Sequence, residues 1–271
     1  MNKALDLYCA DGGATRGLQL AGFHTTGVDI DAHPRYCGDA FIQANALTFP
    51  LDGFDFIWAS PPCQAFTRLR HLHTRKYPKL IARTRARLVK SGIPFCIENV
   101  EEAPLGPNGN LIMLCGTMFG LRTKDGRAEL RRHPLFETSF SIPLRPQCQH
   151  GHVPSLSVVG RGGHFTAPKV ITVCGHTPVG NVKPATLSVC GTGLDDNRMR
   201  QVRAITVTGS TAQTNVQRNI VRETFTVEQA REAMGIDWMS MKGLSQAVPP
   251  AYSKFIAEQW LKSSEPRPEV F

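Results

Sequence analysis

"DLYCADGGATRGLQLAGF", residues 6 to 23, decides the fold class, because it reads as a strand, a glycine-rich turn and a helix in direct succession. Gly12 and Gly13 let the backbone turn tightly and approach a ligand, and the following helix N-terminus favours polar or anionic groups. Ala10 replaces the first glycine of the G-x-G-x-x-G pattern of dinucleotide enzymes. The neighbouring segments must therefore indicate what this turn binds.

The alternation of strand and helix continues to residue 100. The runs that predict strands are "ALDLYCA" (4–10), "TTGVDI" (25–30), "FDFIWAS" (54–60) and "IPFCIENV" (93–100). Helices are predicted at "ATRGLQLAG" (14–22) and at "KLIARTRARLVKSG" (79–92), which ends in Gly92 before a proline. This spacing predicts an α/β protein with a parallel, doubly wound, Rossmann-like sheet.

Polar side chains follow the expected strands, where open α/β sheets bind their ligands. Asp11 follows the first strand, Asp29 ends the second, Cys63 comes just after another, and Glu98 ends the last. Asp29 could accept hydrogen bonds from ribose hydroxyls, which together with the glycine turn favours a nucleoside-containing cofactor. The alternative is an ordinary turn acid.

"SPPCQ" presents Cys63 on a loop whose two prolines fix the backbone, and the basic segment downstream would favour its thiolate. That is the arrangement of a nucleophile, whereas most free cysteines are structural. Glu98 could hydrogen-bond to a base ring and protonate it, or it could be a loop or cap acid.

The charge of the chain is concentrated in one segment. The net charge is +9, and between Arg68 and Lys90 lie nine basic residues without an acid, so the rest of the chain is balanced. Such a segment commonly meets phosphates, and the alternative is a solvated, arginine-rich helix face. Eight scattered cysteines indicate reduced core residues rather than a disulfide scaffold.

Beyond residue 143 the pattern changes to short β-branched runs that end in glycine: "SVVGRG" from 157, "TVCGHT" from 172, "SVCGTG" from 188 and "TVTGST" from 206. We predict a catalytic domain over 1–143, a small β-rich insertion over 144–221, and a C-terminal part over 222–271 that completes the catalytic domain. Helices there should begin at Thr226, as N-cap, and at the proline pair of "PPAYSKF". No window reaches the roughly 18 apolar residues of a membrane span, so we expect no membrane contact and a cytoplasmic location, in a bacterial or phage-infected cell.

Seven motifs in this order resemble the DNA (cytosine-5) methyltransferase family over nearly the whole chain. They are the glycine turn (6–18), Asp29-Ile30, Pro61-Pro62-Cys63-Gln64, Glu98-Asn99-Val100, "ELRRHPLFE" (129–137), "ETFTVEQAREAMGI" (223–236) and "SQAVPP" (245–250). The likeness is to a small, Dcm-like member, and a phage type is one option. In that family the insertion is the target-recognition domain, and the last helix completes the cofactor site.

The resemblance implies S-adenosylmethionine as methyl donor and double-stranded DNA as partner, with the protein acting as a monomer. Cys63 would attack C6 of a flipped-out cytosine while Glu98 engages N3 and the exocyclic amine, so that C5 accepts the methyl group. The implied catalytic residues are Cys63, Glu98, Arg132, Pro62 and Asn99. The implied cofactor-binding residues are Tyr8, Asp11, Gly12, Gly13, Asp29, Ile30, Asn45, Ala46, Pro61, Gln246 and Ala247.

Some positions depart from the family pattern. Asn45 stands where many members have an acid that contacts adenine, and Ser245-Gln246 replace Gly-Asn, so a modified relative of the donor stays open. Pro134 interrupts the usual arginine pair, which leaves either Arg131 or Arg132 to contact the base, with a slight preference for Arg132.

No metal is expected, because the cysteines and histidines of the insertion lack the spacing of zinc knuckles. The residues weighed for zinc are Cys148, His150, His152, Cys174, His176 and Cys190. Three functions stay open: a DNA methyltransferase with a protective, restriction or regulatory role, an RNA (tRNA) cytosine methyltransferase of the same fold, and a catalytically silent DNA-binding relative.

Overall fold

The structure is a computed structural model that describes residues 1–67, 77–106, 109–126, 128–143, 145–150 and 226–264. For 155–159 and 205–208 it describes the strand backbone. None of the helices in these ranges is both long enough and apolar enough to cross a membrane.

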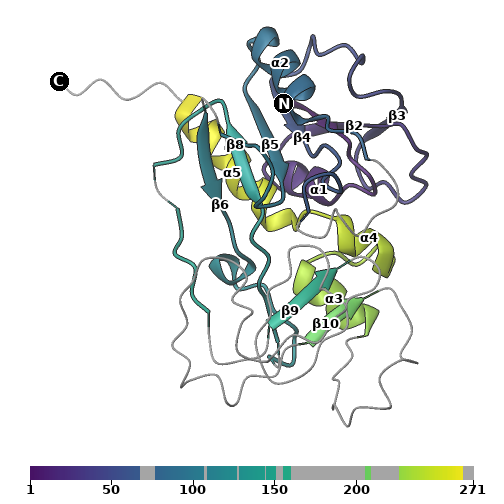
Figure 1. Cartoon of the computed structure of the whole chain (residues 1–271), viewed down its shortest axis with the longest axis vertical. Helices are drawn as coiled ribbons and strands as arrows, with labels where there is room; N and C mark the ends of the chain where they lie inside the picture. The colour runs from purple at the N-terminus through teal and green to yellow at the C-terminus, as the bar shows by residue number, and fades with distance from the viewer. Residues whose placement is uncertain are drawn as a thin grey trace, which may run out of the picture.

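A seven-stranded sheet forms the centre of the molecule, in the order β3-β2-β1-β4-β5-β8-β6 (Figure 1). Its strands are β1 (Lys3–Leu7), β2 (His24–Asp29), β3 (Ala40–Gln43), β4 (Phe56–Ala59), β5 (Phe95–Asn99), β6 (Asn110–Met113) and β8 (Leu135–Thr138). The first five are parallel, whereas β8 runs antiparallel to both of its neighbours. The Rossmann-like class is confirmed, and the parallel arrangement predicted from the first 100 residues is confirmed for β1 to β5, to which β8 and β6 add an antiparallel edge.

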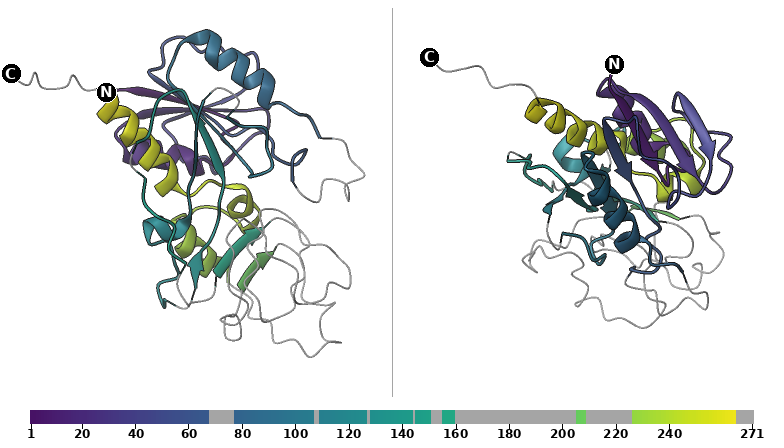
Figure 2. Two further views of the ribbon diagram at one scale, coloured as in Figure 1. Left: turned by 60° about the vertical axis from the view of Figure 1, so that its left-hand side comes forward. Right: turned by 90° about the horizontal axis from the view of Figure 1, so that it is seen from above.

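Helices cover both faces of this sheet, as Figure 2 shows. On one face α1 (Gly13–Leu20) and α5 (Pro250–Ser264) pack on a core that includes Phe23, Phe56, Trp58 and Tyr252. On the other, α2 (Ile81–Ser91) buries Leu88 near Leu5, Leu7, Ile57 and Ile97. Strand order reverses between β1 and β4, so the crevice at their carboxyl ends is where ligands bind in such sheets.

Two helices from distant parts of the chain meet closely because of a glycine. A side-chain carbon on Gly17 of α1 would lie 2.1 Å from the carbonyl oxygen of Pro250, at the start of α5. Ser253 donates a hydrogen bond of 2.8 Å to the carbonyl of Ala14 across the same contact. The C-terminal helix α5 therefore packs directly against α1 of the N-terminal half.

A second sheet of three strands, in the order β10-β9-β7, lies beside α3 (Val227–Met234) and α4 (Met241–Gln246) (Figure 1). Its strands are β7 (Glu129–Leu130), β9 (Ser155–Val159) and β10 (Ile205–Thr208). β9 and β10 cover two of the four repeated runs, and the runs from 172 and 188 lie outside the described residues. The β-rich insertion and its limits stay a prediction.

The predicted helix ends are confirmed. Gly92 terminates α2 with a φ of 70°. Thr226 caps α3 reciprocally with Gln229, through hydrogen bonds of 3.2 and 3.1 Å. Pro250 begins α5.

Asp6 is a buried acid whose ionisation should oppose folding. Its side chain is 1% exposed, Thr15 donates to Oδ2 at 2.5 Å, and Oδ1 has no partner among the described residues. Burial, together with the negative charges of Asp29 and Glu98, raises the pKa of Asp6 to about 7. The carboxyl therefore stays protonated in the folded protein at pH values where the unfolded chain has ionised.

We expect Asp6→Asn to stabilise the protein at alkaline pH. Because the folded pKa of Asp6 is above its ordinary value, its contribution is fully present below about pH 4 and falls as pH rises to about 7. A tenfold difference between the folded and unfolded acid dissociation constants corresponds to about 1.4 kcal/mol, so asparagine should gain a few kcal/mol at pH 8 relative to pH 4. Urea unfolding of both proteins at the two pH values measures this, and a difference independent of pH would contradict it.

Candidate functional site

The turn after β1 has an unusual backbone. Tyr8 and Ala10 adopt positive φ angles of 63° and 46°, which are rare for residues other than glycine, and Gly12 follows with 88°. The Tyr8 amide donates to the carbonyl of Val28 at 2.8 Å, and the Ala10 amide donates to Asp29 Oδ2 at 3.0 Å. Such strained positions cluster at ligand sites, and here the end of β2 holds them in place.

The two glycines of the turn are needed for contacts within the chain. A side-chain carbon on Gly13 would lie 2.5 Å from the carbonyl oxygen of Val248, and one on Gly12 would lie 2.8 Å from Cys37 Sγ. The Trp238 indole also donates to the carbonyl of Asp11 at 2.8 Å. The space beside the two glycines is occupied by Val248 and Cys37 of the same chain. The approach of a ligand to these glycines therefore stays a prediction.

Asp29 ends β2 with a carboxylate that still has acceptor capacity. Oδ2 accepts from Ala10, and Oδ1 accepts from the amide of Asp31 at 3.1 Å, so each oxygen retains a second lone pair. His33 lies between two acids, with Nδ1 3.0 Å from Asp11 Oδ1 and Nε2 3.6 Å from Asp29 Oδ1. Next to Asp29, the Ile30 side chain is 66% exposed, which leaves an apolar surface beside an acceptor.

The loop after β3 is the third part of this edge. Asn45 is exposed, and its Oδ1 accepts from the amide of Leu47 at 2.9 Å. Ala46 is buried, and its carbonyl accepts from Arg87 of α2 at 2.5 Å. From the C-terminal part, Gln246 is exposed at the end of α4, whereas Ala247 is buried.

Across the crevice, the loop after β4 carries Cys63. The amide of Ser60 donates to the carbonyl of Leu7 at 3.1 Å, and Asn99 donates from Nδ2 to the carbonyl of Pro61 at 2.7 Å. Pro61 is buried, while Pro62 and Cys63 are partly exposed. Asn99 at the end of β5 thus positions the loop through a hydrogen bond within the chain.

Cys63, Glu98 and Arg132 influence one another electrostatically. Burial and, after it, the negative charge of Glu98 raise the pKa of the Cys63 thiol to about 11, and Arg132 opposes both. Burial likewise raises the pKa of Glu98, against the opposing effects of Arg132 and of a hydrogen bond with Ser60. Desolvation and the adjacent carboxyl outweigh Arg132, and the effect of the downstream basic segment on the thiolate stays a prediction. The segment 68–76, part of the basic run, lies outside the described residues.

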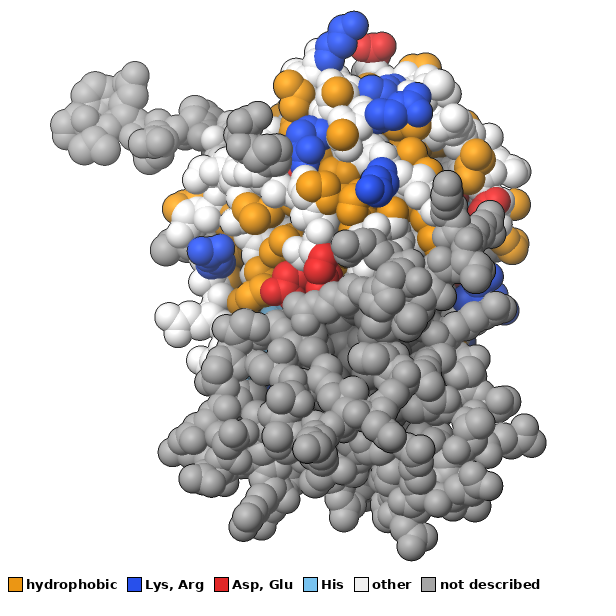
Figure 3. All heavy atoms as spheres, in the orientation of Figure 1, with side chains coloured by type: hydrophobic (Ala, Val, Ile, Leu, Met, Phe, Trp, Pro, Cys, Tyr) orange, Lys and Arg blue, Asp and Glu red, His pale blue; other side chains and the backbone are white. Residues whose placement is uncertain are grey.

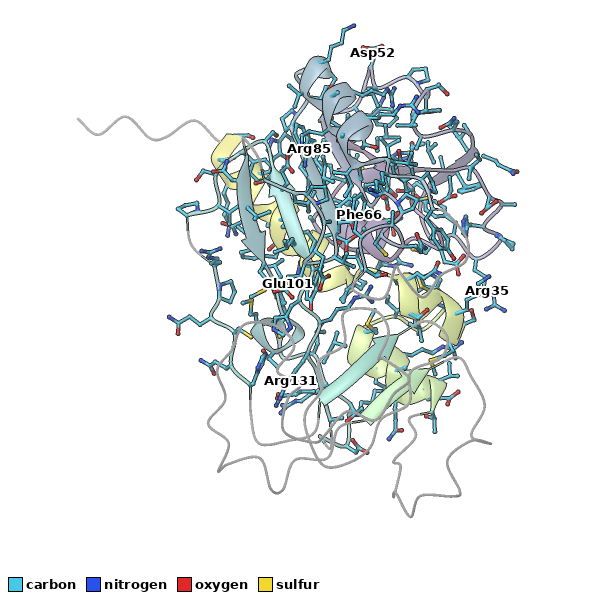
Figure 4. The ribbon with its side chains drawn as sticks, viewed as in Figure 1. Arg35, Asp52, Phe66, Arg85, Glu101 and Arg131 are labelled. Carbon is cyan, nitrogen blue, oxygen red and sulfur yellow. The ribbon has the colours of Figure 1, made fainter. Side chains whose placement is uncertain are left out.

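The two adjacent arginines differ in their surroundings. Arg131 is tied to Glu129 of β7 by contacts of 2.6 Å from both Nε and Nη2. In Figure 4 it lies by the second sheet, well below Phe66 in the turn that follows Cys63. Arg132 instead carries a buried Nη1 without a partner in the described part of the chain, and its charge acts on both Cys63 and Glu98. Of the two arginines, Arg132 is therefore the one whose charge acts at the loop after β4 and at β5, and its contact with a base stays a prediction.

Two members of the basic segment are engaged inside the protein. Arg85 binds both carboxylate oxygens of Glu137 at 2.6 Å, and Arg87 donates to the carbonyls of Ala46 and Phe49 at 2.5 Å. The Lys and Arg side chains visible in Figure 3 are separated by apolar and uncharged surface. Arg85 and Arg87 therefore hold α2 to β8 and to the loop after β3, and a phosphate-facing surface on the rest of the segment stays a prediction, because its first part lies outside the described residues.

Arg85→Ala should destabilise the protein by about 3 kcal/mol, because it leaves the nearly buried Glu137 carboxylate without its cation. The neighbouring Arg83→Ala removes an exposed charge from the same helix and should change stability by less than about 0.5 kcal/mol. Chemical denaturation of both variants tests this pair of expectations. Equal effects of the two substitutions would contradict it.

The strand order reverses between β1 and β4, and Asp29, Cys63 and Glu98 lie at the strand ends on this edge of the sheet. This arrangement is that of a Rossmann-like methyltransferase fold. Similar solved structures include a protein described as a DNA modification methyltransferase encoded within an E. coli prophage, at 14% identity and a TM-score of 0.54 over 97% of this chain and 99% of that one. The S. pombe Dnmt2 methyltransferase (14%, TM-score 0.50, covering 98% and 100%) and the Entamoeba histolytica methyltransferase EhMeth (12%, 0.50, 98% and 99%) are also similar. No protein-family model matches the chain, and no curated protein does. The resemblance predicted from the motifs is therefore confirmed at the level of the fold.

Sequence reasoning missed three residues of this site. His33 lies between Asp11 and Asp29, Trp238 reaches the turn after β1 from the C-terminal part, and Ser60 hydrogen-bonds with Glu98. Ser60 could have been found from its position at the end of a predicted strand. The other two lie in loops whose approach only the folded chain reveals.

Proposed function

We propose that this protein transfers a methyl group from S-adenosylmethionine to C5 of a flipped-out cytosine in double-stranded DNA, through a covalent bond between Cys63 and C6. The observation that carries the proposal is the position of Cys63 and Glu98 at the carboxyl ends of β4 and β5, where the charge of Arg132 acts on both. A thiol, a carboxyl of raised pKa and a guanidinium with a free buried nitrogen are the groups that attack on a pyrimidine ring requires.

The edge formed by β1, β2 and β3 fits the proposed cofactor. Asp29 retains lone pairs for ribose hydroxyls, the exposed Ile30 offers an apolar surface to adenine, and Asn45 can both donate and accept. Asp11 and the backbone of the turn after β1 would lie near the methionine part. S-adenosylmethionine would supply an electrophilic methyl group when bound.

In the proposed reaction, the Cys63 thiol first loses its proton, and its sulfur then forms a bond to C6 of the cytosine. Glu98, whose pKa is raised by burial, donates a proton to N3, so that the electrons displaced from C6 do not build up a full negative charge on the ring. C5 is thereby made nucleophilic. After methylation, loss of the C5 proton to water, return of the N3 proton to Glu98 and cleavage of the bond to sulfur restore the aromatic ring and release Cys63.

Arg132 has a defined part in this proposal. Its cation lowers the pKa values of both Cys63 and Glu98 against the effect of burial, and its unpartnered Nη1 can donate to the oxygen of an incoming base. The target base must leave the duplex to reach the thiol, at a cost of a few kcal/mol. We infer that the thiolate forms only after the base has entered.

The substrate is tested by incubating the protein with tritiated S-adenosylmethionine and either duplex DNA or transfer RNA. Label on DNA supports the proposal, label on RNA alone would replace it with a tRNA cytosine methyltransferase, and no label on either would favour a silent DNA-binding relative. Bisulfite sequencing of the methylated DNA then gives the base and its sequence context together.

A further inference from the structure

Four potential metal ligands meet away from the crevice. They are Cys115, His133, Cys148 and His150, whose ligand atoms all lie within 4.8 Å of one another. Cys115 is the N-cap of the short helix η2 (Gly116–Phe119), His133 lies between β7 and β8, and Cys148 and His150 follow β8 in the segment that leads toward β9. Three separate stretches of chain therefore bring these side chains to one point.

The spacing of the ligand atoms is close to the edges of a tetrahedron. With Zn–S of about 2.3 Å and Zn–N of about 2.0–2.1 Å, a tetrahedral ion sets sulfur and nitrogen about 3.6 Å apart and two nitrogens about 3.3 Å apart. Here His150 Nε2 lies 3.5 Å from Cys115 Sγ and 3.2 Å from His133 Nε2, and His133 Nε2 lies 3.4 Å from Cys148 Sγ. One further separation, from Cys148 Sγ to His150 Nε2, is shorter, at 2.8 Å.

The ligand atoms are directed at one another. The Nε2 atoms of His133 and His150 lie 3.2 Å apart, so both rings present the same nitrogen to the cluster. Because zinc is held by thiolates and neutral imidazoles, a divalent ion bound here would displace the protons of the two thiols.

We propose that Cys115, His133, Cys148 and His150 bind one structural zinc ion. Two thiolates and two neutral imidazoles are the ligands that zinc prefers over magnesium or calcium, and four protein ligands leave no open position for a reacting water. Thr117 Oγ1, 3.2 Å from Cys115 Sγ, supplies a hydrogen-bond donor to a ligating sulfur.

The site would have a mechanical role that goes beyond the proposed reaction. His133 directly follows Arg132, and Cys148 and His150 precede β9, the first strand of the expected insertion. A bound ion would therefore fix the turn that holds Arg132 and tie the start of the insertion to the main sheet. Cys148 and His150 belong to the expected insertion, whereas Cys115 and His133 lie before it, so the ion would join the two parts.

Metal analysis of the full-length protein, purified without added chelator, tests the site. We expect about one zinc per chain in the wild type and loss of most of it in Cys148→Ser and in His150→Ala, because each removes one of four ligands. Cys37→Ser and His24→Asn remove a thiol and an imidazole elsewhere and should retain the zinc. Cys174→Ser and Cys190→Ser should also retain it.

Cobalt(II) provides a second readout that does not depend on the folding of variants. Wild-type protein stripped with a chelator and reloaded with cobalt should show the intense visible bands of a tetrahedral thiolate site, with two protons released per ion bound. Wild type without zinc that gives no such bands would overturn the proposal, as would a Cys115–Cys148 disulfide detected by mass spectrometry, or zinc retained in Cys148→Ser and His150→Ala.

Discussion

Cys63→Ser is expected to lower the rate of methyl transfer by about 10³-fold or more, because a hydroxyl is a far poorer nucleophile than a thiolate. The substitution is nearly isosteric, and the turn in which the Phe66 amide donates to the carbonyl of residue 63 should persist. Binding of S-adenosylmethionine, measured by calorimetry, should therefore stay within about two-fold of the wild type.

A trapping experiment makes this expectation sharper. DNA with fluorine at C5 of the target cytosine cannot lose a proton from that carbon, so the bond to sulfur should persist. The wild type should form a complex that survives denaturation, and Cys63→Ser should form none. A stable complex with the serine variant, or full activity without Cys63, would refute the mechanism.

Glu98→Gln should reduce methyl transfer by about 10² to 10⁴-fold, the usual contribution of a positioned proton donor. Glutamine can hydrogen-bond to N3 of the base but cannot protonate it. Glu258→Gln, on the exposed face of α5, is a matched control and should retain wild-type activity.

The pH dependence distinguishes a proton donor from a group that only shapes the site. Because burial raises the pKa of Glu98, the carboxyl stays protonated to a higher pH than an ordinary glutamate, and its contribution is lost as pH rises through that raised value. The ratio of wild-type to Glu98→Gln rates should therefore fall with increasing pH. Because the negative charge of Glu98 also raises the pKa of the Cys63 thiol, the ionisation of Cys63 is measured in both proteins and divided out of the ratio. A ratio that is constant with pH would show that Glu98 does not act by donating a proton.

Arg85 illustrates what a local sequence pattern cannot predict. It belongs to the basic segment that predicts a phosphate-facing surface, yet it is paired with Glu137, 52 positions further along the chain. No local pattern could reveal this pair, because β8 joins the sheet antiparallel to β5 after a long excursion. Cys115, His133 and Cys148 are also far apart in the sequence, so their cluster does not have the short ligand spacing by which a zinc site is recognised.

The sequence by itself determined the strand-turn-helix unit, the helix ends at Gly92 and Thr226, and the placing of Asp29, Cys63 and Glu98 at strand ends, because hydrophobic periodicity and capping are local properties. The tertiary structure alone decided which arginine faces Cys63 and Glu98, whether the thiol is charged, and which cysteines and histidines meet. These depend on burial and on charges brought together from distant segments, and desolvation acts only once the chain has closed around a group.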